Sequence, residues 1–161
     1  MAAQCATDLD DNPLWQFAIA TYAKPNVAAH LLRGQDELKL DVLWCLTALW
    51  LATQQRRLTS ESKQQAAYDE WQRSMITPLR TLRYRCDKET DADLRRALLA
   101  AELAAEKRGI RLLYLGLTGN DDIAVVDQYD SEALLFDNLG ALTGDDQWIN
   151  ELAKLLWQSN G

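Results

Sequence analysis

The 161-residue sequence is poor in the residues that interrupt helices and in those that favour strands. It has only three prolines and seven glycines, and valine and isoleucine are scarce beside alanine, leucine, glutamine, glutamate and arginine. Because the abundant residues have high helix propensities, this composition favours helix throughout the chain. The length fits one domain and is sufficient to bury a hydrophobic core.

Cysteine and histidine are scarce too, which argues against several kinds of site. Cys5, Cys45 and Cys86 form no Cys-x-x-Cys pair, so we predict free thiols in a reducing cytosol rather than disulfides or a zinc site. The single histidine, His30, has no serine elbow, dinucleotide-binding glycine motif or P-loop beside it, so we interpret it as a packing residue. The Glu-x-x-His spacing of di-metal helical bundles is also missing. We therefore predict no catalytic residues, metal or cofactor.

Long apolar runs are absent as well. The most apolar stretch, residues 42–52, is too short to cross about 30 Å of hydrocarbon, and we interpret it as a buried core helix. Residues 1–11 are acidic and short of apolar side chains. We therefore expect a flexible N-terminus that is not a signal peptide, and a cytoplasmic protein.

Positive charge is in deficit, with a formal net charge of −7. This balance argues against a general affinity for nucleic acid or an acidic membrane. The charge is also uneven: residues 73–111 contain ten basic and six acidic side chains, whereas residues 112–161 contain one basic and nine acidic. Two interpretations stay open, namely ordinary solvated helix faces or an attraction between the two regions, within one chain or between copies.

Capping residues and apolar spacing divide the chain into helices. The predicted helices, with their caps, span about residues 12–23, 25–32, 41–57, 60–82, 90–116, 131–142 and 145–156. Gly34 is expected to end the second helix, and Pro78 to kink or split the fourth near Thr77. Residues 120–130 are interpreted as an extended loop. The prediction is an all-α, single-domain bundle of six or seven helices, with the third and fifth innermost.

The fourth predicted helix carries a stripe of apolar residues at core spacing. Its members follow one another at intervals of 3, 4, 4 and 3 residues: Tyr68, Trp71, Met75, Leu79 and Leu82. We expect this stripe to face the core.

The fifth predicted helix places two carboxylates inside its apolar face. At 100° per residue, Glu102 and Glu106 fall within the arc of the surrounding apolar residues, Leu98, Leu99, Leu103, Ile110, Leu113 and Leu117. A buried carboxylate needs a partner, and an arginine fork suits one well. We therefore expect Arg80 or Arg83 to meet Glu102 or Glu106. Two interpretations stay open: a buried ion network that sets helix register, or a polar pocket for a small ligand.

The predicted C-terminal helix is amphipathic and carries two tryptophans. If exposed, Trp148 and Trp157 would mark a surface for a protein partner or a second copy of the chain. The predicted organisation is therefore a flexible segment 1–11, a helical bundle over residues 12–142, and an additional amphipathic helix over residues 143–161 packed on the same domain.

Three segments resemble a proteobacterial family catalogued as domain of unknown function 2390. They are residues 12–27 with Asn-Pro-Leu-Trp-Gln-Phe-Ala, residues 35–52 with Leu-Asp-Val-Leu-Trp-Cys-Leu, and residues 71–106 with Ala-Glu-Leu-Ala-Ala-Glu. The resemblance covers roughly residues 12–142. It departs at Asn26, where a glycine is expected, and it does not extend to the tail from Asp145. It implies an all-helical bacterial cytosolic protein and no particular activity.

Two functions are carried forward from the sequence. The first is a non-catalytic cytosolic helical protein that acts through protein–protein contact, as a homodimer or with another partner. It rests on the missing catalytic motifs, the tail helix and the uneven charge. The alternative is a ligand-binding or enzymatic bundle with a polar pocket around Arg80, Arg83, Glu102 and Glu106.

Overall fold

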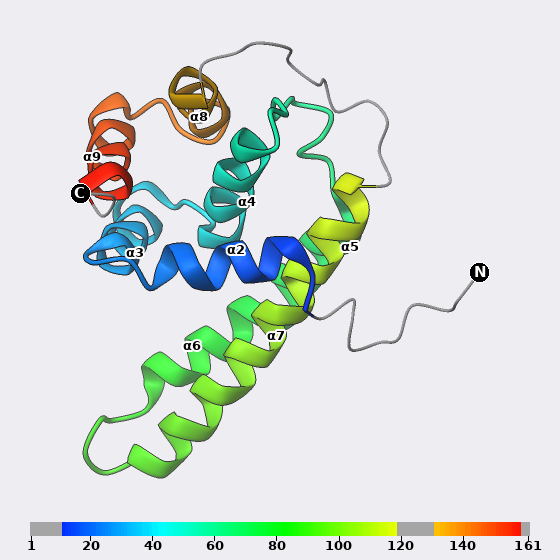
Figure 1. Cartoon of the computed structure of the whole chain (residues 1–161). Helices are drawn as coiled ribbons and strands as arrows, with labels where there is room; N and C mark the ends of the chain where they lie inside the picture. Colours follow the sequence, from blue (N-terminus) through cyan, green and yellow to red (C-terminus); the bar gives the residue numbers. More distant parts are fainter. Residues whose placement is uncertain (1–10, 119–130, 159–161) are drawn as a thin grey trace.

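The computed structural model describes residues 11–118 and 131–158, which form an all-α bundle (Figure 1). It contains seven helices within these ranges when the continuous segment over residues 66–85 is counted once. The elements are α2 (Pro13–Tyr22), α3 (Val27–Leu38), α4 (Val42–Thr53), α5 (Ala66–Trp71), the π-helix η1 (Gln72–Ile76), α6 (Thr77–Arg85), α7 (Ala92–Thr118), α8 (Ser131–Gly140) and α9 (Asp146–Gln158). The predicted fold class is confirmed. No helix in this part of the chain has the length and apolar character needed to span a membrane.

Some predictions fall outside the described residues. These are the flexible segment 1–11, apart from its last residue, the loop over residues 120–130, and the thiol of Cys5. The division of the chain at residues 142 and 143 stays a prediction. Of the other thiols, Cys45 is buried in α4, and this burial raises its pKa.

Helix α4 lies at the centre of the bundle, in contact with α2, α3, α7 and α8. Ten consecutive residues, 43–52, are buried, because neighbours cover this apolar helix on every side. Asp41 caps it by accepting a hydrogen bond from the Leu43 N–H at 2.9 Å. The prediction that this helix continues to Arg57 was wrong. It ends at Thr53, because Gln55 adopts a positive φ and the chain turns away.

Helix α3 runs through Gly34, so the prediction that this glycine ends the helix was wrong. A Cβ built on Gly34 would lie 2.7 Å from Cζ2 of Trp148 in α9. The glycine therefore permits close approach of the indole ring. The helix ends instead at Leu38, and the next residue, Lys39, adopts the left-handed conformation.

Substituting Gly34→Ala should lower the free energy of unfolding by a net amount of about 1 kcal/mol. Alanine has the better helix propensity, but the steric cost of its methyl group exceeds that gain. The added methyl group must displace the buried Trp148 ring. Urea denaturation measures the change. Gly140→Ala is the matched control, since nothing lies within 4 Å of a Cβ built there. An unchanged or higher stability for Gly34→Ala would show that the ring relaxes freely.

The fourth predicted helix forms as α5, η1 and α6 joined end to end, with the expected distortion beside Pro78. In the π-turn the Thr77 N–H donates to the Gln72 carbonyl, five residues back. A proline in the next turn lacks an N–H and crowds the preceding carbonyls, which accounts for a distortion here. The wider turn shifts the register, so Ile76 is buried while Met75 and Leu82 are exposed. The prediction that those two face the core was wrong.

The start of this helix also differs from the prediction. It begins at Ala66 rather than near Ser60. The residues before it form a loop in which Thr59 and Ser62 bond to each other's side chains and backbone, including Thr59 N–H to Ser62 Oγ at 2.7 Å.

Helices α6 and α7 pack against each other as a hairpin that projects from the rest of the bundle (Figure 1). Only the second half of α7 is innermost: Ile110, Leu113 and Leu117 are fully buried. The expectation that the whole helix is central was wrong for its first half, where Leu94 and Leu103 are exposed. This half extends beyond the core, so fewer helices cover it.

Helix α9 packs on α3 and α8, and this contact buries Trp148. The Trp148 side chain is 6% exposed, its ring stacks on His30, and its Nε1 donates to the His30 carbonyl at 3.2 Å. The prediction of Trp148 as a partner surface was therefore wrong, because its apolar face is already covered within the chain. Trp157 does lie at the surface, 41% exposed.

Candidate functional site

Four charged side chains meet between α6 and α7. Arg80 and Arg83 are three residues apart in α6, and Glu102 and Glu106 are four apart in α7, so each pair lies on one face of its helix. The packing of the two helices turns these faces toward each other. The structure therefore brings together all four residues that the sequence singled out.

Glu102 is the centre of this network. Its Oε1 accepts hydrogen bonds from Arg80 Nε at 2.9 Å and from Arg83 Nη2 at 3.3 Å, and its Oε2 accepts one from Arg83 Nε. The Glu102 side chain is only 3% exposed. Burial opposes its ionisation, but the hydrogen bonds from Arg83 and Arg80 together outweigh burial and lower its pKa. Glu102 is thus a buried, fully partnered carboxylate.

Glu106 is held less completely. Its Oε1 accepts one hydrogen bond, from Arg80 Nη2 at 3.3 Å. Burial raises its pKa, and the charges of Glu102 and Asp41 raise it further, while Arg80 opposes them. The two glutamates therefore differ in how well their charges are compensated: two arginines bond to Glu102, whereas one bonds to Glu106.

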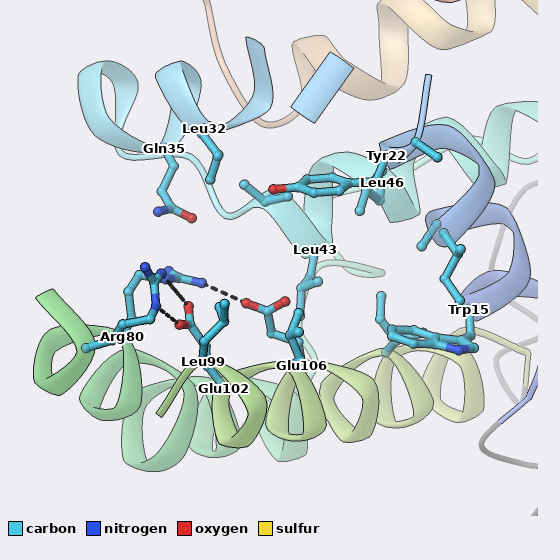
Figure 2. Close-up of a pocket in the computed structure, with 17 residues that line it drawn as sticks. Trp15, Tyr22, Leu32, Gln35, Leu43, Leu46, Arg80, Leu99, Glu102 and Glu106 are labelled. Atoms are coloured by element: carbon cyan, nitrogen blue, oxygen red, sulfur yellow. Dashed lines mark hydrogen bonds and ion pairs between the residues drawn. The ribbon is translucent and has the colours of Figure 1, made fainter. Parts of the chain in front are cut away.

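A cavity of about 520 Å³ opens beside this network, between the α6–α7 hairpin and the helices α2, α3 and α4 (Figure 2). This volume lies within the range of small-molecule sites. Its wall is mostly apolar, and its lining comprises Trp15, Ala18, Ile19, Tyr22, Ala23, Leu32, Gln35, Val42, Leu43, Leu46, Arg80, Arg83, Leu99, Glu102, Leu103, Glu106 and Ile110. The four charged residues around which the sequence left a polar pocket open all lie in this lining, whereas the apolar wall from α2, α3 and α4 was not foreseen.

The cavity has a polar end and an apolar end. Figure 2 shows Gln35, Arg80 and Glu102 gathered at one end, and Trp15 at the other. Several lining residues leave much of their apolar surface exposed, namely Ile19, Tyr22, Leu32, Leu99 and Leu103. Contiguous exposed apolar surface of this kind marks binding sites in soluble proteins.

Tyr22 and Asp41 also contribute to the electrostatics of the cavity, and sequence analysis overlooked both roles. Burial raises the pKa of Tyr22, and the Glu106 charge raises it further. Asp41 accepts a 2.6 Å hydrogen bond from the Tyr68 hydroxyl, and burial raises its pKa too. Asp41 is recognisable in sequence only as a helix cap, which is a common role for aspartate.

Comparison with known proteins places this region in one family. A family model described as a protein of unknown function, DUF2390, matches residues 13–113. That range contains every residue lining the cavity, from Trp15 to Ile110, whereas α8 and α9 lie beyond it. No curated protein and no solved structure matches the chain.

Proposed function

Since the chain belongs to the DUF2390 family, whose function is unknown, we propose a function from the geometry: non-catalytic binding of an amphipathic small molecule in the cavity. The cavity of about 520 Å³, apolar along most of its wall and charged at one end, is the observation that carries this proposal.

The charged groups support binding rather than catalysis. Arg80 and Arg83 both donate hydrogen bonds to Glu102, as in structural ion pairs. Serine, threonine, cysteine and histidine are absent from the described residues that line the cavity, and each of its two carboxylates is bonded to at least one arginine. A ligand would therefore gain affinity from its apolar part and orientation from the polar end.

A protein partner is the second candidate. Trp157 in α9 and Leu82, Tyr84 and Leu94 in the hairpin are exposed apolar side chains outside the cavity lining. Exposed aromatic side chains are common anchors at protein interfaces. These side chains lie outside the cavity lining, so a binding experiment at the cavity distinguishes the two candidates.

Nile red, an uncharged apolar probe, should bind the protein and fluoresce, and the substitution Ala18→Phe should weaken that binding at least about tenfold. Ala18 is buried in the cavity wall, so the larger ring occupies the space of the probe. Fluorescence titration measures the dissociation constant.

Ala20→Phe is the matched control, because Ala20 lies two residues away in α2, is exposed and does not line the cavity. Circular dichroism checks that each variant is folded. Should Ala18→Phe fail to fold, Leu103→Gln makes the rim polar at an exposed position and should also weaken binding. Equal affinity in the wild type and all these variants would refute the cavity proposal and leave the partner surface.

A further inference from the structure

One carboxylate oxygen at the cavity has no hydrogen-bond partner within residues 11–118 and 131–158. Glu106 Oε1 bonds to Arg80, whereas no described residue bonds to its Oε2. In Figure 2 one oxygen faces Arg80 and the other points away from it, along the cavity. The Glu106 side chain is 23% exposed, so it is reachable from the cavity yet largely shielded from bulk water. A partly desolvated carboxylate oxygen of this kind favours a hydrogen-bond donor, above all a charged one.

The charged side chains that line the cavity are two carboxylates, Glu102 and Glu106, and two guanidinium groups, Arg80 and Arg83. Both arginines donate hydrogen bonds to Glu102, whereas Glu106 receives one hydrogen bond, from Arg80. The buried carboxyl group of Asp41 lies behind the lining and interacts with Arg80 and Glu106. Glu106 is therefore the charged group of the lining with the least compensation, and the group best placed to receive a cation.

Tyr22 lies in the lining and interacts with the charged end of the cavity. Burial raises the pKa of Tyr22, the Glu106 charge raises it further, and Arg80 opposes this effect. The Tyr22 hydroxyl oxygen makes no hydrogen bond within the described ranges and is available as an acceptor.

We propose that the ligand carries a positively charged head group, a protonated amine, which pairs with the free oxygen of Glu106 near the Tyr22 hydroxyl. Its apolar part lies along the cavity toward Trp15. This inference rests on the proposed function and adds the chemical class of the ligand. An anionic head group at this position would face the Glu106 carboxylate, whereas Arg80 and Arg83 are already engaged by Glu102.

Three compounds with the same chain test the head group: n-octylamine, n-octanol and n-octanoate. At pH 7 they carry charges of +1, 0 and −1. Competition against Nile red should show octylamine binding about tenfold more tightly than octanol, with octanoate weakest. Glu106→Gln keeps the shape of the side chain and removes its charge, so it should abolish the preference for octylamine over octanol.

Glu61→Gln is the control, because it removes the same charge at an exposed position outside the cavity and should retain the preference. Octanol or octanoate binding as tightly as octylamine would overturn the head-group assignment while the cavity proposal stands. An undiminished preference in Glu106→Gln would overturn it equally. If none of the three compounds displaces Nile red, both proposals fail.

Discussion

Glu102→Gln is expected to lower the free energy of unfolding by about 3 kcal/mol, the low end of the range for breaking a buried ion pair. The substitution removes the charge that balances Arg80 and Arg83, whose side chains are 20% and 16% exposed. Two guanidinium groups would then stay close together, partly desolvated, with only Glu106 to offset them. Because both guanidinium groups keep some contact with water, we expect a loss of stability at the low end of that range. Urea denaturation measures the change.

The exposed ion pair of Asp93 and Arg96, also in α7, provides the control. Asp93→Asn should change stability by less than about 0.5 kcal/mol, because both partners are solvated. A double-mutant cycle of Glu102→Gln with Arg80→Gln should give a coupling of about 1–2 kcal/mol. Additive effects of the two substitutions would mean that the network contributes little to the hairpin.

Trp148→Ala should be the most destabilising substitution, by about 4 kcal/mol, as for other large aromatic residues deleted from a core. The loss combines the stacking on His30, the hydrogen bond to the His30 carbonyl, and the contact that Gly34 permits. The helix α9 would then pack on α3 over a void. The thermal midpoint should fall by at least about 10 °C for a chain of this size.

Trp157→Ala is the matched control, since it removes the same side chain from the exposed face of the same helix and should cost less than about 1 kcal/mol. A similarly small loss for Trp148→Ala would show that α9 contributes little to the stability of the bundle. Comparing the stabilities of Trp148→Ala and Trp157→Ala also shows which variant can be used in experiments on protein partners. Only Trp157→Ala tests a surface without unfolding the helix that carries it.

Local signals in the sequence were sufficient for most helix starts and for the distortion beside Pro78. Asn12 accepts a hydrogen bond from the Trp15 N–H at 2.8 Å, and Asp145 accepts one from Trp148 N–H at 3.0 Å, as helix caps do. A cap acts on the first turn and a proline on the turn before it, so neighbouring residues decide both. The consequence for Met75 was not predictable, since a π-turn shifts every later residue.

The pairing of Arg80 with Glu102 could be predicted from the sequence for a different reason. A carboxylate at the centre of an apolar helix face must find a cation, and the nearest arginines on an adjacent helix are the natural candidates. The helix pattern correctly predicted that Glu102 is buried. It did not predict that Leu99 and Leu103 are exposed, because the same helical face passes from the core into the cavity wall.

Composition, caps and periodicity thus specified an all-helical chain, its main helix starts and its charged cluster, because these depend on interactions within a few residues or on an unpaired buried charge. The cavity, the burial of Trp148 against Gly34 and the free oxygen of Glu106 depend on contacts among α2, α3, α4, α7 and α9. Such contacts are set by how helices far apart in sequence pack, and a helix pattern records which face is apolar but not what covers it.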